Sequence, residues 1–211
     1  MSKIEELAAA KKPRQAWGWR YGYGLRELER AYQSSRYKSD AELADIHERA
    51  SKHQKLVDEG NAVWTQEDDE GYPVYDSGEH LGEQAYEEEQ VLRLVRGAFA
   101  ISLHHYIETA IGPHLSNKKY VHDKAMDWLK QVGWKPDETI LNQLRMAANC
   151  AKHGEGSSAK NLYAERPDMF DERIEGWGSE PSSDTLALSD DHMSEFFKAA
   201  REAVPKMPIT F

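Results

Sequence analysis

The sequence predicts an all-α fold: a bundle of about five to seven helices, with an irregular aromatic N-terminal arm and an acidic loop. Long segments carry apolar residues at helical spacing, the connectors are rich in Gly and Pro, and no series of alternating strands is present. We expect residues 1–24 to form the arm and residues 25–211 to form one helical domain.

The longest expected helix covers residues 83–111, and its apolar residues occupy most of its circumference. Such a helix is typical of the centre of a bundle, and Gly112-Pro113 is expected to end it. His104 and Glu108 are spaced i, i+4, which predicts a pair at a domain or subunit contact. A metal site would need further ligands, and no HExxH pattern is present, so we expect no metal and no cofactor.

A second helix is expected over residues 137–154, where the sequence supplies a signal for each end. Asp137 suits the exposed N–H groups of the first turn, and Gly154 follows the basic Lys152 and His153 as a stop signal. Its expected apolar stripe contains small residues, which would let another helix approach closely. The stripe consists of Ile140, Leu144, Ala147, Ala148 and Ala151.

Opposite this stripe, Arg145, Asn149 and His153 form a polar row at i, i+4 and i+8. One interpretation is a solvated face whose C-terminal histidine interacts with the helix dipole. The other is a phosphate site, because Arg binds phosphate, His moves protons near neutral pH and Asn can orient either group. In both interpretations the row faces water, a ligand or another subunit.

Residues 144–170, LRMAANCAKHGEGSSAKNLYAERPDMF, resemble the terminal region of HEPN-like bacterial proteins, which are all-α domains of defence and toxin–antitoxin systems. Residues 91–111, VLRLVRGAFAISLHHYIETAI, resemble the long central helix of that family. In active members an Arg, usually followed by a polar residue, precedes a His on a late helix, and two copies cut RNA without metal at a dimer interface. Here Ala148 stands where the family has its Arg, and Arg145 lies one turn earlier.

The resemblance therefore implies two alternative functions in a defence or stress system. In the first, the protein is a non-catalytic interaction domain with a degenerate site. In the second, it is a metal-independent endoribonuclease in which His153 is the general acid/base, Arg145 stabilises the phosphate charge and Asn149 orients them. We also expect a homodimer, because helix faces with aromatics and a polar row outside the core are suitable surfaces for self-association.

The N-terminal arm carries Trp17, Trp19, Tyr21 and Tyr23, separated by Gly or by Arg20. These residues could form a stacking platform for bases, with basic residues nearby. The favoured interpretation is that the aromatics anchor an irregular terminus on the helical body or on a partner protein.

Charge and composition limit the choice of partner. The net charge is −10, and residues 61–90 carry ten acidic residues and no Lys or Arg, which argues against broad nucleic-acid binding. RNA at a local site remains an option, because residues 91–160 carry ten basic and six acidic residues. No run of about 18 apolar residues is present, so we expect no membrane span. The single cysteine, Cys150, fits a cytoplasmic protein.

Overall fold

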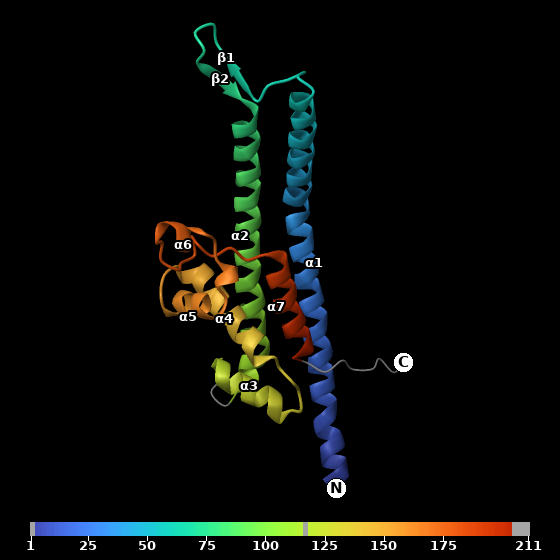
Figure 1. Ribbon diagram of the computed structural model, residues 1–211. Coiled ribbons are helices and arrows are strands. Elements are labelled where there is room, and N and C mark those ends of the chain that lie inside the picture. Colours follow the sequence, from blue (N-terminus) through green and yellow to red (C-terminus); the bar gives the residue numbers. More distant parts are fainter. Residues whose placement is uncertain (1–2, 116–117, 204–211) are drawn as a thin grey trace. The chain divides into compact units, whose positions relative to one another are not determined.

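The computed structural model describes residues 3–115 and 118–203, with side chains from Trp17 onward. Within these ranges most of the chain is helical (Figure 1), which confirms the predicted all-α class. The helices are α1 (Lys3–Asp58), α2 (Ser77–Ile111), α3 (His122–Gln131), α4 (Glu138–His153), α5 (Ser157–Glu165), α6 (Arg173–Trp177) and α7 (Asp190–Glu202). Two strands, β1 (Thr65–Glu67) and β2 (Pro73–Asp76), and two 3-10 turns, Gly112–His114 and Pro167–Met169, complete the elements.

The chain divides into two compact units. One unit contains Met1–Tyr32 and Arg96–Phe211, and the other contains Gln33–Val95. Helices α1 and α2 each contribute residues to both units. The candidate site residues identified from the sequence all belong to the first unit.

The second unit consists of a helical pair closed by a β-hairpin. Ile46 of α1 and Leu92 of α2 are its buried apolar residues. Antiparallel β1 and β2 form the hairpin, where the sequence had predicted an acidic loop. The Asp76 carboxylate accepts the hydroxyl of Thr65 through one oxygen and the amides of Gly78 and Glu79 through the other. This carboxylate therefore both closes the hairpin and caps the start of α2.

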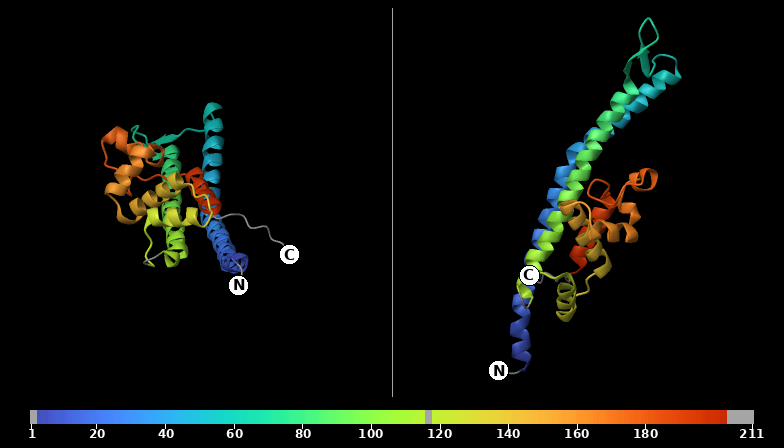
Figure 2. Two further views of the ribbon diagram at one scale, coloured as in Figure 1. Left: turned by 90° about the horizontal axis from the view of Figure 1, so that it is seen from below. Right: turned by 90° about the vertical axis from the view of Figure 1, so that its left-hand side faces the viewer.

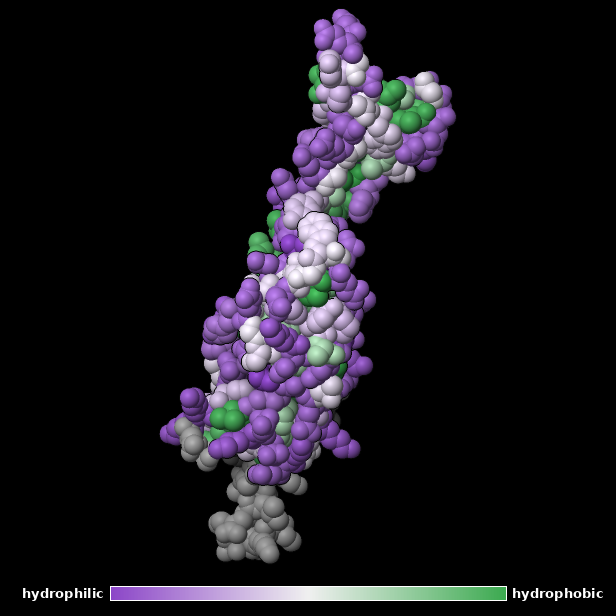
Figure 3. All heavy atoms as spheres, turned by 60° about the vertical axis from the view of Figure 1, so that its left-hand side comes forward, coloured by the Kyte–Doolittle hydropathy of each residue, from purple (hydrophilic) through white to green (hydrophobic). Residues whose placement is uncertain are grey.

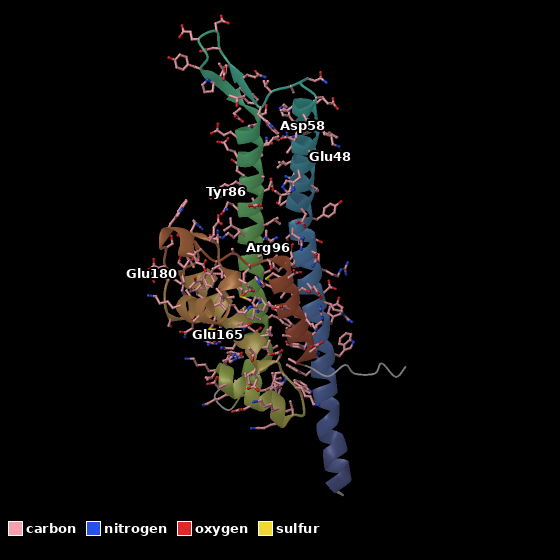
Figure 4. The ribbon with its side chains drawn as sticks, in the orientation of Figure 1. Glu48, Asp58, Tyr86, Arg96, Glu165 and Glu180 are labelled. Carbon is pink, nitrogen blue, oxygen red and sulfur yellow. The ribbon has the colours of Figure 1, made fainter. Side chains whose placement is uncertain are left out.

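Helix α7 supplies much of the core of the first unit. Its buried apolar side chains are Met193, Phe196, Phe197, Ala199 and Ala200. The helix lies beside the first part of α1 (Figures 1 and 2), and the Tyr21 hydroxyl donates to the carbonyl of Ala200 at 3.1 Å. At its N-terminus, Asp190 accepts hydrogen bonds from Tyr32 of α1 at 2.5 Å and from Arg96 of α2 (Figure 4) at 3.1 and 3.2 Å. Burial, followed by this contact with Asp190, raises the pKa of Tyr32 to about 12.

The irregular N-terminal arm predicted for residues 1–24 is not observed, because residues 3–24 belong to α1. Pro13 and the glycines of this segment indicated an interrupted helix, since each lowers helix propensity. Tertiary packing offsets that cost. Trp17 stacks on Tyr21 and on Trp134, with ring centroids 5.3 and 4.9 Å apart, and its indole N–H donates to the carbonyl of Ala110.

Polar contacts also join α4, α7 and the Pro167–Met169 turn. Arg166 donates to Asp168, to Gln143 of α4 and to Glu195 of α7. The Nδ1 atom of His192 accepts the amide of Ser189, so its Nε2–H donates to Asp168 at 2.9 Å. Asp168 therefore accepts hydrogen bonds from two side chains on different segments.

Replacing this acceptor, Asp168→Asn, is expected to lower the free energy of unfolding by about 1 kcal/mol at pH 7, because the carboxylate is half exposed. Arg166, and then His192, hold the pKa of Asp168 well below its usual range. A depressed carboxyl pKa stabilises the fold above about pH 4, the unfolded value, and this contribution is lost as the pH falls further. Urea unfolding at pH 7 and pH 3 should therefore show the difference between variant and wild type shrinking in acid. Glu172→Gln, at an exposed position, is the control, and an undiminished difference at pH 3 would contradict the assignment.

The surface is strongly polar. The face drawn in Figure 3 is mostly hydrophilic, with small scattered hydrophobic patches, in agreement with the mean hydropathy of −0.80. Large exposed apolar side chains are therefore informative where they occur.

Candidate functional site

Helix α4 forms at the predicted position. The side chain of Asp137 accepts the amide of Ile140, and the helix ends at Gly154 with φ 75°. Positive φ is easily adopted by Gly, and this residue follows Lys152 and His153 as the sequence indicated. The helix that carries the polar row is thus confirmed.

The buried side of α4 is broader than the predicted stripe. Gln143, Met146 and Cys150 are buried together with Leu144, Ala147 and Ala148. The helix packs against α5 and α7, and a Cβ atom placed on Gly97 of α2 would lie 3.7 Å from the Cβ of Ala151. The small residues of α4 therefore allow close approach, as their pattern predicted.

The three residues of the polar row lie in different environments. Arg145 and Asn149 are half-buried, whereas His153 is exposed. The Nε and Nη2 atoms of Arg145 donate to the side-chain oxygen of Asn142 at 3.1 and 2.8 Å. Arg145 and His153 are separated by about 12 Å along the helix axis, since each residue adds about 1.5 Å. The three residues of the row therefore differ in exposure, and their role as one site stays a prediction.

A partly buried polar cluster lies close enough to Arg145 to feel its charge. It contains His104 of α2, Tyr120 of the following connector and His122 at the start of α3. The rings of His104 and Tyr120 are perpendicular with centroids 5.9 Å apart, and the Tyr120 hydroxyl lies 3.2 Å from Nδ1 of His122. Three segments separated in sequence thus place two imidazoles and a phenol beside α4.

His104 is the least satisfied member of this cluster. It is 8% exposed, and its Nε2 atom has no hydrogen-bond partner among the described residues. Its Nδ1 atom lies 3.9 Å from Glu108, which is too long for a hydrogen bond. The i, i+4 pair predicted from the sequence is present only as this loose contact.

The environment of the cluster keeps both imidazoles neutral. Burial lowers the pKa of His104, an effect opposed by Glu108 and reinforced by Arg145, His105 and Lys152. Burial, followed by Arg145, lowers the pKa of His122 to about 4. Burial also raises the pKa of Tyr120, which therefore remains a hydroxyl donor. Glu108, 3.9 Å from Nδ1 of His104, favours protonation of this imidazole, but burial has the larger effect.

The aromatic segment of α1 has two faces. Trp17 and Tyr21 pack inward, and Tyr21 is 3% exposed. Trp19 and Tyr23 are 60% and 50% exposed, and they stack on each other with centroids 5.8 Å apart. Anchoring on the helical body thus accounts for Trp17 and Tyr21 only.

Cations accompany the outward pair. Arg20, Arg26 and Arg30 are exposed, and the guanidinium of Arg26 lies 5.9 Å from the ring centre of Tyr23. We call Trp19, Tyr23, Arg26 and Arg30 the outer stripe of α1. The sequence had included Arg20 in the interaction segment, but it did not indicate Arg26 or Arg30.

Sequence reasoning also missed Tyr120 and His122. No local pattern joins them to His104, because the three residues lie on α2, a connector and α3. Their proximity depends on the tertiary fold. Over the described ranges, no group of three His, Cys, Asp or Glu side chains could hold a metal ion.

Comparison with protein-family models, with curated proteins and with solved structures finds no match. Within residues 3–115 and 118–203, no helix combines the length and apolar content needed to span a membrane.

Proposed function

We propose that this chain is a HEPN-like bacterial helical domain that binds another protein in a defence or stress system and does not cut RNA. The proposal starts from the resemblance of residues 144–170 to the terminal region of that family. The observation that carries the non-catalytic assignment is the environment of Ala148, which stands where active members have Arg and which is 3% exposed.

The surroundings of Ala148 support the same assignment. Arg145, the nearest arginine on α4, is bonded to Asn142 and lies beside the His104 cluster. His153 is exposed about 12 Å further along the helix. Within one chain the guanidinium and this imidazole therefore lack the close arrangement that phosphate-charge stabilisation and proton transfer require together.

Binding is supported by the outer stripe of α1. An exposed, stacked Trp–Tyr pair contributes little to a monomer's own core, whereas Trp, Tyr and Arg are enriched among the residues that dominate protein interfaces. The net charge of −10 favours a protein over a nucleic acid as partner.

The second candidate is a metal-independent endoribonuclease completed by a second copy. Exposure of His153 at the end of α4 favours it, because a partner chain could bring a cation to this imidazole. His153 would then transfer protons, Arg145 would stabilise the phosphate charge and Asn149 would orient the two.

Wild-type protein is expected to leave labelled RNA intact in EDTA over hours at micromolar enzyme, and His153→Ala is expected to behave identically. His105→Ala, at another exposed histidine, is the control. Product bands from wild type and His105→Ala that disappear with His153→Ala would overturn the non-catalytic proposal in favour of the nuclease.

A further inference from the structure

We infer that the outer stripe of α1 binds the same stripe of a second copy of this chain, with the two helices antiparallel and related by a two-fold axis. The inference rests on the proposed binding function and names its partner. It depends on the order and spacing of four exposed side chains in the first unit.

The four residues lie on one face of α1. Trp19, Tyr23, Arg26 and Arg30 are spaced by 4, 3 and 4 residues, so they fall within about 60° of one another at ~100° per residue. All four are exposed, whereas Tyr21, Leu25 and Tyr32 on the opposite face are buried. The spacing is that of a helix–helix seam.

The stripe is self-complementary only when one helix is reversed. The intervals of 4, 3 and 4 residues are the same when counted from either end. From the N-terminus, two aromatic residues are followed by two arginines. Antiparallel pairing therefore places Trp19 opposite Arg30 and Tyr23 opposite Arg26, and the two-fold axis repeats both pairs. Each pair sets a guanidinium against an aromatic ring, an interaction already present within one chain between Arg26 and Tyr23.

Parallel pairing has the opposite consequence. It would place Arg26 and Arg30 against their own copies, bringing like charges together along the C-terminal half of the contact. A nucleic acid could also stack on Trp19 and Tyr23, but the net charge of −10 opposes its approach. A second copy in the reversed direction provides a cation for each aromatic ring and an aromatic ring for each cation.

One flank of the outer stripe carries charges of opposite sign, which can pair between the two copies. Arg20 and Glu27 are exposed and lie about 20° apart in projection on the same side of Trp19. A two-fold axis perpendicular to both helices brings like flanks together, so Arg20 of each copy approaches Glu27 of the other. The contact of Glu27 with Arg30 of its own chain is long, at 3.4 Å, and both side chains are exposed, so Glu27 is able to exchange partners.

The first test measures oligomeric state by sedimentation at micromolar concentrations. Wild type is expected to be in monomer–dimer equilibrium, Trp19→Ala to weaken dimerisation by about thirtyfold or more, and the double variant Arg26→Glu/Arg30→Glu to be monomeric. Trp177→Ala and Lys198→Glu, which change an exposed Trp and an exposed Lys elsewhere, should dimerise as wild type does. Far-ultraviolet circular dichroism confirms that each variant is folded.

The second test reports the direction of the helices. Arg20→Glu and Glu27→Arg should each weaken the homodimer several-fold, because each places like charges on the shared flank. An equimolar mixture of the two should restore dimers, as should the variant that carries both changes. Restoration requires residue 20 of one copy to meet residue 27 of the other.

Three results would overturn the inference: a wild-type chain that stays monomeric at about 1 mM, a dimer insensitive to Trp19→Ala and Arg26→Glu/Arg30→Glu, or a failure of the charge exchange to restore association. Saturable binding of a single-stranded RNA oligonucleotide that is lost in Trp19→Ala, with the chain monomeric, would assign the stripe to nucleic acid instead. These results leave the RNA-cleavage test unaffected, so the inference and the non-catalytic assignment fail separately.

Discussion

Gly24→Ala is expected to lower the free energy of unfolding by about 2 kcal/mol, although alanine is the better helix former. A Cβ atom at position 24 would lie 2.5 Å from the hydroxyl oxygen of Tyr106 and 3.0 Å from two of its ring carbons. Tyr106 is held there, because its hydroxyl donates to the carbonyl of Tyr21 at 2.8 Å. Relieving the overlap therefore breaks a hydrogen bond and moves a ring that packs on Tyr21.

Gly22 provides the matched control on the same helix. A Cβ atom there meets nothing within 4 Å, so Gly22→Ala should raise the free energy of unfolding by about 0.5–1 kcal/mol through helix propensity alone. Urea unfolding of the two variants measures the changes in the free energy of unfolding, which are expected to have opposite signs. In a Tyr106→Ala background the cost of Gly24→Ala should largely disappear. Equal effects of the two alanines would show that Tyr106 does not limit position 24.

The same packing explains why the N-terminal segment could not be predicted from sequence. Pro13 and the alternating glycines are local signals, and local signals indicate an interrupted helix. The long-range contacts of Trp17 and Tyr21 decide the outcome. One of the glycines, Gly24, is moreover required by Tyr106 from another helix. A residue that reads as a helix breaker is here a packing requirement.

In the candidate site, too, features set by neighbouring residues were predictable and features set by the tertiary fold were not. Helix α4 was predicted correctly, because the Asp137 cap and the Gly154 stop are properties of neighbouring residues. The electrostatic influence of Arg145 on His104 and His122 could not be predicted, since these two residues come from two other helices. Periodicity places a residue on a helix face, but it does not show which elements cover that face.

Acidification from pH 7 to pH 4 is expected to destabilise the first unit through the imidazoles of His104 and His122. The pKa of His122 falls from 6.5 to about 4 on folding, owing first to burial and then to Arg145, with Asp123 and Glu138 opposing. Between these values the unfolded chain binds a proton that the folded chain does not. Stability is therefore complete above about pH 6.5 and is lost as the pH falls toward 4, below which both states are protonated.

Burial likewise lowers the pKa of His104, so its contribution has the same sign. For His122 the fall in pKa corresponds to at most about 3 kcal/mol, and we expect about 1–2 kcal/mol because the ring is only half-buried. Urea unfolding between pH 7 and pH 4 measures the loss. His122→Asn, which retains an acceptor for the Tyr120 hydroxyl, should flatten the dependence in this range.

The exposed His47 provides the control, and His47→Asn should leave the slope unchanged. The loss of stability through Asp168 in acid does not interfere with this measurement. The stabilisation by a carboxyl of depressed pKa disappears only below about pH 4. An unchanged slope in both His122→Asn and His104→Asn would mean that the cluster does not control the response to acid. A flattened slope would establish that the imidazoles of His104 and His122 are neutral in the folded chain, where burial and the charge of Arg145 disfavour their protonation.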